Sequence, residues 1–184
     1  MEEIYPTLQE VQQQRLQHYS TGSCLQLLKN ACTMKYSTPT GKTFANMGIV
    51  LPEDLDSTRF RVIRSACSLL GRVPYFWGGK SDSLGWDAKW GVPTVITSEE
   101  SWQGETVRPY GLDCSGLVAW AFINGAGDVN ALNRIGHGTD VQFANCRVIS
   151  TAEAQPGDLV FKIEEGVIAH TGIVVGTNAS GELM

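Results

Sequence analysis

Cys114 is the residue whose type and surroundings best suit covalent chemistry. It stands in YGLDCSGLVAWAF, residues 110–122, directly before an apolar run of helical spacing. A thiol attacks as its thiolate, and the unpaired N–H groups and positive dipole end of a helix N-terminus stabilise that anion. Asp113 can accept hydrogen bonds from the first-turn amides, while Ser115 and Gly116 leave the sulfur uncrowded. The sequence therefore allows two interpretations, a nucleophile at a helix start or a buried core cysteine.

A cysteine nucleophile also needs a base, and the chain has three histidines, His18, His137 and His170. His18 falls in an N-terminal segment of helical pattern, and His137 lies in the glycine-flanked RIGHGTD, which is typical of a solvated turn. His170 instead interrupts the apolar run VIAHTGIVVG, which predicts a strand. We expect a half-buried imidazole there, acting either as a general base or as a core histidine bonded to a backbone carbonyl.

The composition excludes several classes of function. With 184 residues, 42% of them hydrophobic and 18% charged, the chain suits one globular domain with an appended N-terminal segment. Fourteen Lys and Arg against nineteen Asp and Glu give a net charge of −5 without a basic cluster, so we expect no nucleic-acid partner. No apolar stretch approaches the roughly 20 residues of a membrane span, which predicts no integral membrane segment in this chain. The five cysteines include no C-x-x-C pair, and we expect neither metal nor cofactor.

Two helices and a hairpin are predicted around these candidates. Asp56 or Ser57 can cap a helix that Gly71 ends, and a second helix runs over residues 114–124 until Gly125 and Gly127 terminate it. The apolar face of the first helix comprises Phe60, Ile63, Cys67 and Leu70, so Cys67 is expected to be a core thiol.

The later part of the chain predicts antiparallel strands. The runs 158–163 and 167–175 are rich in β-formers and are joined by the short turn EEG, which predicts a hairpin. Helices followed by antiparallel strands indicate an α+β fold.

The domain organisation follows from the same pattern. Residues 1–50 are interpreted as an N-terminal helical segment of unassigned role, and residues 51–184 as the domain that carries the chemistry. Residues 80–112 form a long connection that holds Trp86, Trp90 and Trp102. Connections of that length are either functional lids and binding loops or surface excursions pinned by their large side chains.

Four motifs resemble those of the NlpC/P60 cysteine peptidases. They are, in family order, PYFWGG at 74–79, DCSGLV at 113–118, QPGDLVF at 155–161 and AHTGIVVG at 169–176. The resemblance extends from about Asp56 to the end of the sequence. It implies a papain-like α+β domain in which the nucleophile begins a helix packed on an antiparallel sheet, and the sheet carries the base.

The resemblance also implies roles for individual residues. Cys114 would be the nucleophile, His170 the general base, and the amide N–H of Cys114 would help to bind the oxyanion. The implied substrate-binding residues are Tyr75, Trp77, Asp113 and Ser115; Tyr75 would line the site, and Asp113 and Ser115 would help to hold the peptide, in some family members through its free amine.

The substrates that the resemblance implies are the stem peptides of bacterial peptidoglycan. They would be hydrolysed at the bond between γ-D-glutamate and the following diamino acid. An extracellular or cell-wall location follows only from that substrate. The sequence leaves two other functions open: a peptidoglycan-binding module of the same fold whose tryptophans grip wall fragments, and a related acyltransferase or amidase that uses the same Cys and His.

Two features depart from the family pattern. Family members usually join the WGG and DCSG motifs by a much shorter link, so residues 80–112 are an insertion that we expect to flank the groove. A third polar residue that orients the base is expected on the strand after the one bearing His170, which would place it beyond residue 184. Asn178 lies in a predicted turn and is not expected to replace it.

Overall fold

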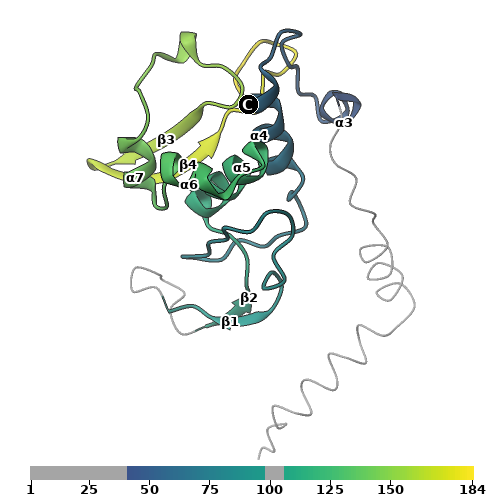
Figure 1. The fold of residues 1–184 in the computed structure, drawn as a ribbon. Helices are drawn as coiled ribbons and strands as arrows, with labels where there is room; N and C mark the ends of the chain where they lie inside the picture. The colour runs from purple at the N-terminus through teal and green to yellow at the C-terminus, as the bar shows by residue number, and fades with distance from the viewer. Residues whose placement is uncertain (1–40, 98–105) are drawn as a thin grey trace, which may run out of the picture. The chain divides into compact units, whose positions relative to one another are not determined.

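The computed structural model describes residues 41–97 and 106–184, with side chains described from Phe44 onward. All of these residues belong to one structural unit, Thr38–Met184 (Figure 1). Residues 1–40 of the predicted N-terminal helical segment, together with His18 and Trp102, lie outside the described residues.

The described unit contains both helices and strands, and the β3–β4 pair of strands comes last in the chain. The helices are α3 Gly41–Asn46, α4 Ser57–Cys67, α5 Cys114–Ala126, α6 Leu132–Ile135 and α7 Thr139–Ala144, with short 3₁₀ turns η1 Val129–Ala131 and η2 Thr151–Glu153. The strands are β1 Pro93–Val95, β2 Val107–Pro109, β3 Leu159–Glu164 and β4 Val167–Ile173. None of the described helices is long and apolar enough to cross a bilayer.

Helix α4 begins as predicted and ends earlier than predicted. The Asp56 carboxylate accepts from the N–H groups of Thr58 (2.8 Å) and Arg59 (3.1 Å), which caps the helix. After Cys67 the backbone tightens into turns of shorter period, so Leu70 leaves the apolar face and is 59% exposed. The predicted end at Gly71 and the predicted burial of Leu70 are therefore wrong.

Cys67 is a core thiol, as predicted. It packs with Phe44, Ile49 and Ile63, and burial raises the pKa of its thiol to about 11. Because Phe44 and Ile49 share this core, the packing of the unit begins before residue 51; the predicted division between residues 50 and 51 stays a prediction.

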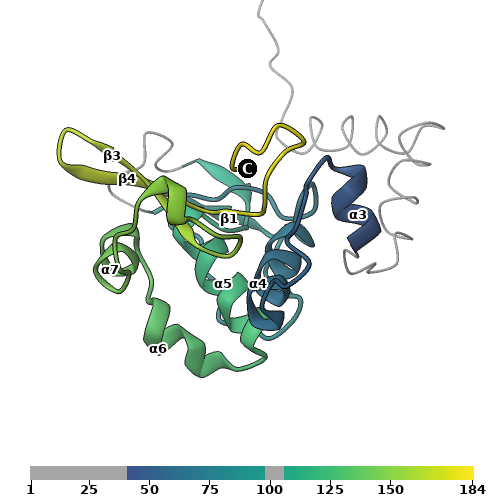
Figure 2. The same ribbon diagram turned by 90° about the horizontal axis from the view of Figure 1, so that it is seen from above.

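Helices α4 and α5 lie side by side in both ribbon views (Figures 1 and 2). Their close approach depends on Gly125, because a Cβ atom there would lie 2.5 Å from a methyl carbon of Val62. Gly125 is thus an interior packing residue, and the prediction that it ends α5 is wrong. The helix continues to Ala126 and ends at Gly127, whose φ of 69° is the left-handed conformation that glycine adopts without strain.

The predicted hairpin is confirmed. Strands β3 and β4 pair antiparallel through a two-residue turn in which Glu165 (φ 51°) and Gly166 (φ 84°) both have positive φ. Two positive φ values match the type I′ turn that suits the twist of paired strands. The side chain of Ile173 in β4 packs against buried residues of α4 and α5, so the helices lie on the antiparallel hairpin and the fold is α+β as predicted.

The long connection contains a second, small ribbon. β1 and β2 pair antiparallel between Trp90 and Tyr110, and Figure 1 shows this ribbon well separated from the β3–β4 hairpin. Trp90 is 6% exposed and packs with Leu69, Leu112 and Trp120, so it belongs to the core. Trp86, at 44% exposed, contacts the edge of Trp90 and lies near the guanidinium of Arg72.

Candidate active site

Cys114 and His170 line one cleft, although 56 positions separate them in the sequence. The cleft has a volume of about 320 Å³, and its walls come from the end of α4, the start of α5 and strand β4. Tyr75 and Asp113 line it as well. A larger cavity of about 420 Å³ lies between α4, α6 and Cys146, but its described lining includes no histidine. The smaller cleft is therefore the candidate active site.

The thiol of Cys114 stands at the first residue of α5. Asp113 is the N-cap residue: its Oδ1 accepts from the N–H of Gly116 at 2.7 Å, and its carbonyl accepts from the N–H of Leu117 at 2.9 Å. The N–H groups at the start of a helix carry a partial positive charge, and they lie next to the cysteine here. The structure thus confirms the predicted position of Cys114 at the capped start of a helix.

Close backbone contact fixes the start of α5 in place. A Cβ atom on Gly116 would lie 2.2 Å from the carbonyl oxygen of Gly79, and one on Gly79 would lie 2.3 Å from the carbonyl oxygen of Gly111. The Asp113 N–H donates to the Gly79 carbonyl at 3.1 Å. Glycines of the PYFWGG and DCSGLV motifs therefore allow the two segments to touch.

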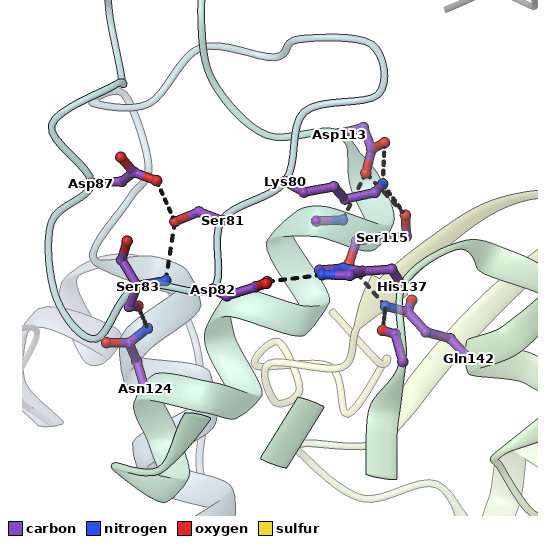
Figure 3. A network of polar contacts seen from close by, with 12 residues as sticks. Lys80, Ser81, Asp82, Ser83, Asp87, Asp113, Ser115, Asn124, His137 and Gln142 are labelled. Atoms are coloured by element: carbon purple, nitrogen blue, oxygen red, sulfur yellow. Dashed lines mark hydrogen bonds and ion pairs between the residues drawn. The ribbon is translucent and has the colours of Figure 1, made fainter. Parts of the chain in front are cut away.

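Lys80 is a neighbour of the site that sequence reasoning missed: it lies outside the cleft lining and contacts Asp113, which lines the cleft. Its Nζ donates to Asp113 Oδ2 and to Ser115 Oγ, the latter at 2.7 Å, and Ser115 Oγ donates to Asp113 Oδ1 at 3.0 Å (Figure 3). One signal in the sequence could have pointed to Lys80: it directly follows the double glycine of the PYFWGG motif.

Ser115 is 3% exposed, so its hydroxyl faces the protein interior. The hydroxyl accepts from Lys80 and donates to Asp113. In this structure Ser115 therefore supports its two neighbours, and a direct contact with substrate would require Lys80 to move.

Tyr75 stands beside the candidate nucleophile. It is 58% exposed and pairs in a parallel bridge with Leu112. Partial burial raises the pKa of the Tyr75 phenol, and negative charge on Cys114 and Asp113 raises it further. Tyr75 is thus a neutral hydrogen-bond donor at neutral pH. Trp77 is half-buried and lies outside the cleft lining as the described residues define it.

His170 differs from the expectation for its strand. Its imidazole is exposed rather than half-buried, and no residue in the described ranges hydrogen-bonds it. Side chains alternate along β4, and it is the neighbouring Thr171, 2% exposed, that points into the protein. The sequence-based prediction of a half-buried, hydrogen-bonded imidazole is therefore wrong, while His170 still borders the cleft beside Thr171 and Gly172.

Helix α7 connects the two elements that carry the candidate pair. The buried Gln142 amide donates to the Ser115 carbonyl at 2.8 Å, one residue from Cys114. Thr139 Oγ1 donates to the Ile168 carbonyl at 2.9 Å, two residues from His170. One short helix thus holds both α5 and β4.

The other polar candidates are engaged elsewhere. His137 lies in the turn before α7 as predicted, and its Nε2 is 2.8 Å from Asp82 Oδ1 across the connection (Figure 3). Asn178 Oδ1 accepts from the N–H groups of Ser180 and Glu182, so this side chain builds its own turn. No group of three or more potential metal-binding side chains occurs within residues 41–97 and 106–184.

Comparison with known proteins identifies the family. The model of the NlpC/P60 family matches residues 71–180, which is more than half of the chain, so the chain belongs to the NlpC/P60 family. The matched range contains the glycine-rich turn before Lys80, the start of α5 and the β3–β4 hairpin. The resemblance drawn from the four motifs is thereby confirmed, and with it the papain-like α+β fold class.

Two curated relatives are similar over shorter stretches. Probable endopeptidase p60 of Listeria grayi is 43% identical over 68 residues, which are 37% of this chain and 12% of that protein. Probable endopeptidase p60 of Listeria seeligeri is 40% identical over 76 residues, which are 41% of this chain and 13% of that protein. The similarity thus spans a small part of each relative's own length.

One solved structure matches this chain at low identity. The peptidoglycan hydrolase RipB from Mycobacterium tuberculosis is 22% identical to this chain, with a TM-score of 0.41 over 92% of this chain and 80% of RipB.

Proposed function

We propose that this chain is a cysteine endopeptidase that hydrolyses peptidoglycan stem peptides. The observation that carries the proposal is the convergence of Cys114, at the capped start of α5, and His170, on β4, at the walls of one cleft. Membership of the NlpC/P60 family supports it, as do relatives that bear the name endopeptidase.

The proposed reaction proceeds through an acyl-enzyme. His170 accepts the proton of the Cys114 thiol, and Sγ attacks the carbonyl carbon of the scissile amide. The Cys114 N–H donates to the oxyanion that develops. As the tetrahedral intermediate collapses, the C–N bond breaks and the imidazolium gives its proton to the leaving amine. Water, deprotonated by His170, then cleaves the thioester and releases the carboxylate product and the free thiol.

Tyr75 and Asp113 are proposed to border the bound peptide. The Tyr75 phenol is exposed at the cleft and neutral, so it can donate a hydrogen bond to a peptide carbonyl. Asp113 acts mainly through position, because its carboxylate caps α5 and bonds Lys80. Trp77 and Ser115 are proposed to support the site from behind its surface.

The bond proposed for cleavage joins γ-D-glutamate to the diamino acid. Because the proposed substrate is the stem peptide of the assembled wall, the proposed place of action is extracellular or at the cell wall. Resemblance of the DCSGLV and AHTGIVVG motifs supports this specificity.

The test is mass spectrometry of muropeptides incubated with the parent chain, with Cys114→Ala and with Cys146→Ala. Cys146 is a second partly buried thiol away from the cleft, so its variant is the matched control. The proposal expects products ending in γ-D-glutamate from the parent and from Cys146→Ala, and none from Cys114→Ala. Equal cleavage by all three chains, or cleavage at another bond, would contradict it.

A binding module is the second candidate, and one observation favours it: within the described residues, nothing orients the His170 imidazole. A base without a partner loses its fixed tautomer and direction, which lowers the rate. In such a module Trp90 cannot grip a ligand, because it is buried, whereas Trp86 is exposed. Saturable binding of muropeptides to the parent chain without any product would favour this candidate.

A further inference from the structure

The Asp113–Ser115 pair beside Cys114 already holds a cation. A carboxylate and a hydroxyl at that position would suit a substrate ammonium group. In this chain they bind the ammonium of Lys80, whose side chain is 30% exposed (Figure 3). Asp113 Oδ1 is occupied as well, by the Gly116 N–H and the Ser115 hydroxyl. The carboxylate next to the candidate nucleophile is thus committed to partners of this chain.

Lys80 is held at both its backbone and its side chain. The Tyr110 hydroxyl accepts from the Lys80 N–H at 3.1 Å and donates to the Lys80 carbonyl at 2.8 Å. The preceding residue, Gly79, contacts the start of α5 through its carbonyl. Little conformational freedom is left for the side chain to lose, so its ion pair with Asp113 is preorganised.

Displacing Lys80 would be costly for an incoming amine. The amine would have to replace two charge-assisted hydrogen bonds and remain close to a second positive charge. A neutral acyl group meets neither obstacle, because its carbonyl oxygen can accept a hydrogen bond from an ammonium that has three donors and uses two of them.

We propose that Lys80 is a specificity-determining residue that excludes peptides with a free terminal amine and selects stem peptides whose amino end is acylated. A stem peptide is in that acylated state while it is still attached to its glycan. This inference rests on the proposed function, since it assigns a substrate class to the same cleft.

The test compares two synthetic peptides, L-alanyl-γ-D-glutamyl-diaminopimelyl-D-alanine with its amino end free or acetylated. The measured quantity is the ratio of kcat/KM for the acetylated peptide to that for the free peptide. Because a charge-assisted hydrogen bond is at stake, the parent should favour the acetylated peptide by about ten- to a hundredfold, and Lys80→Met should lower this ratio at least about tenfold. Lys80→Arg keeps the cation and should preserve the preference.

The control is Lys89→Met, which removes an exposed lysine of the same connection that makes no ion pair with Asp113. A purely structural role of Lys80 would lower both kcat/KM values and leave their ratio unchanged, which would overturn the proposal. The parent chain also tests the proposal by itself, without any variant that has to fold. A higher kcat/KM of the parent for the peptide with the free amine would overturn the proposal as well.

Binding separates this inference from the proposed function. If the parent cleaves neither peptide, the peptidase proposal fails, and calorimetric titration of both peptides into Cys114→Ala decides the inference. Tighter binding of the acetylated peptide would support it. Equal binding, tighter binding of the free amine, or no binding of either peptide would overturn it.

Discussion

The two sides of the candidate active site differ in how firmly the described residues hold them. The cysteine side is fixed by the Asp113 cap, by the Gly79–Gly116 backbone contact and by Lys80. The histidine side consists of an exposed imidazole on a two-stranded hairpin, and its ring has no hydrogen-bond partner within the described residues. The position of the thiol is thus determined by local contacts, whereas the direction of the imidazole is not.

This difference shows which part of the proposed mechanism the structure preorganises. The thiol of Cys114 and its N–H group, which is proposed to bind the oxyanion, belong to one helix turn and move together. His170, the proposed base, belongs to a separate element, β4, which packs on α5 at Ile173 and is linked to it by hydrogen bonds of the short helix α7 through Thr139 and Gln142. We therefore expect substitution of His170 to act mainly on activity, and substitutions that disturb the contacts of the cysteine side to act mainly on stability.

The largest expected effect is on activity, and it compares two histidines. His170→Ala removes the proposed base and should lower kcat/KM by about 10²–10⁴-fold. His137→Ala removes a partly exposed hydrogen bond with Asp82 and should cost about 0.5–1.5 kcal/mol of stability, with activity nearly unchanged. Kinetics on muropeptides and thermal denaturation of both variants provide the check. Similar activity losses in the two variants would argue against His170 as the base.

The second effect is on stability, and it compares two glycines of the cleft region. In Gly116→Ala the new Cβ atom would meet the Gly79 carbonyl oxygen at 2.2 Å, whereas in Gly172→Ala it would meet a Val160 methyl group at 3.3 Å. Gly116→Ala should therefore lower the free energy of unfolding by about 3 kcal/mol or more.

For Gly172→Ala we expect a change below about 1 kcal/mol, because a side-chain methyl group can shift by a few tenths of an ångström. Urea denaturation of the two variants measures both changes. Equal stabilities would mean that the cysteine side is no more rigid than the hairpin.

The smallest expected effect is on the pH dependence of stability, and it concerns the connection 80–112, which also carries Lys80. Asp87 is buried, which by itself would raise the pKa of its carboxyl, but hydrogen bonds from the Lys89 N–H and the Ser81 hydroxyl outweigh burial and lower it. Because the pKa of Asp87 is lowered in the folded state, its ionised carboxylate stabilises the fold at pH values above the ordinary aspartate pKa of about 3.9. The stabilisation is lost as the pH falls through the folded-state pKa.

Asp87→Asn should thus lower stability by about 0.5–1.5 kcal/mol at neutral pH and by less near pH 3. The exposed Asp54→Asn serves as the control. Thermal unfolding between pH 3 and pH 7 follows both variants, and a constant difference between Asp87→Asn and the parent across this range would refute the assignment.

Sequence patterns predicted the features that depend on neighbours along the chain. The cap at Asp113, the helix start at Cys114 and the hairpin with its turn at Gly166 are local, and each is present. Strand alternation located the strand of His170 but left open which face turns inward, and Thr171 occupies the inward position. The predicted burial of His170 was wrong for this reason.

Contacts between distant segments could not be predicted in the same way. Lys80 and Asp113 are 33 positions apart, and their ion pair depends on the backbone approach of Gly79 to Gly116. Trp90 gave the same sequence signal as Trp86, yet it is buried because the connection folds back onto Trp120. Such choices depend on tertiary packing, which a composition or spacing pattern does not contain.

The central proposal is that Cys114, unlike the other thiols of the described unit, acts as a nucleophile. The most direct test is alkylation of the folded chain with iodoacetamide at mildly acidic pH, followed by peptide mapping of Cys67, Cys114 and Cys146. Burial raises the thiol pKa of Cys67 and Cys146, with negative charge on Asp158 adding to the shift at Cys146, so both should react slowly. The account predicts that Cys114 is labelled at least about tenfold faster than either. Labelling of Cys114 at the rate of Cys146 would contradict it.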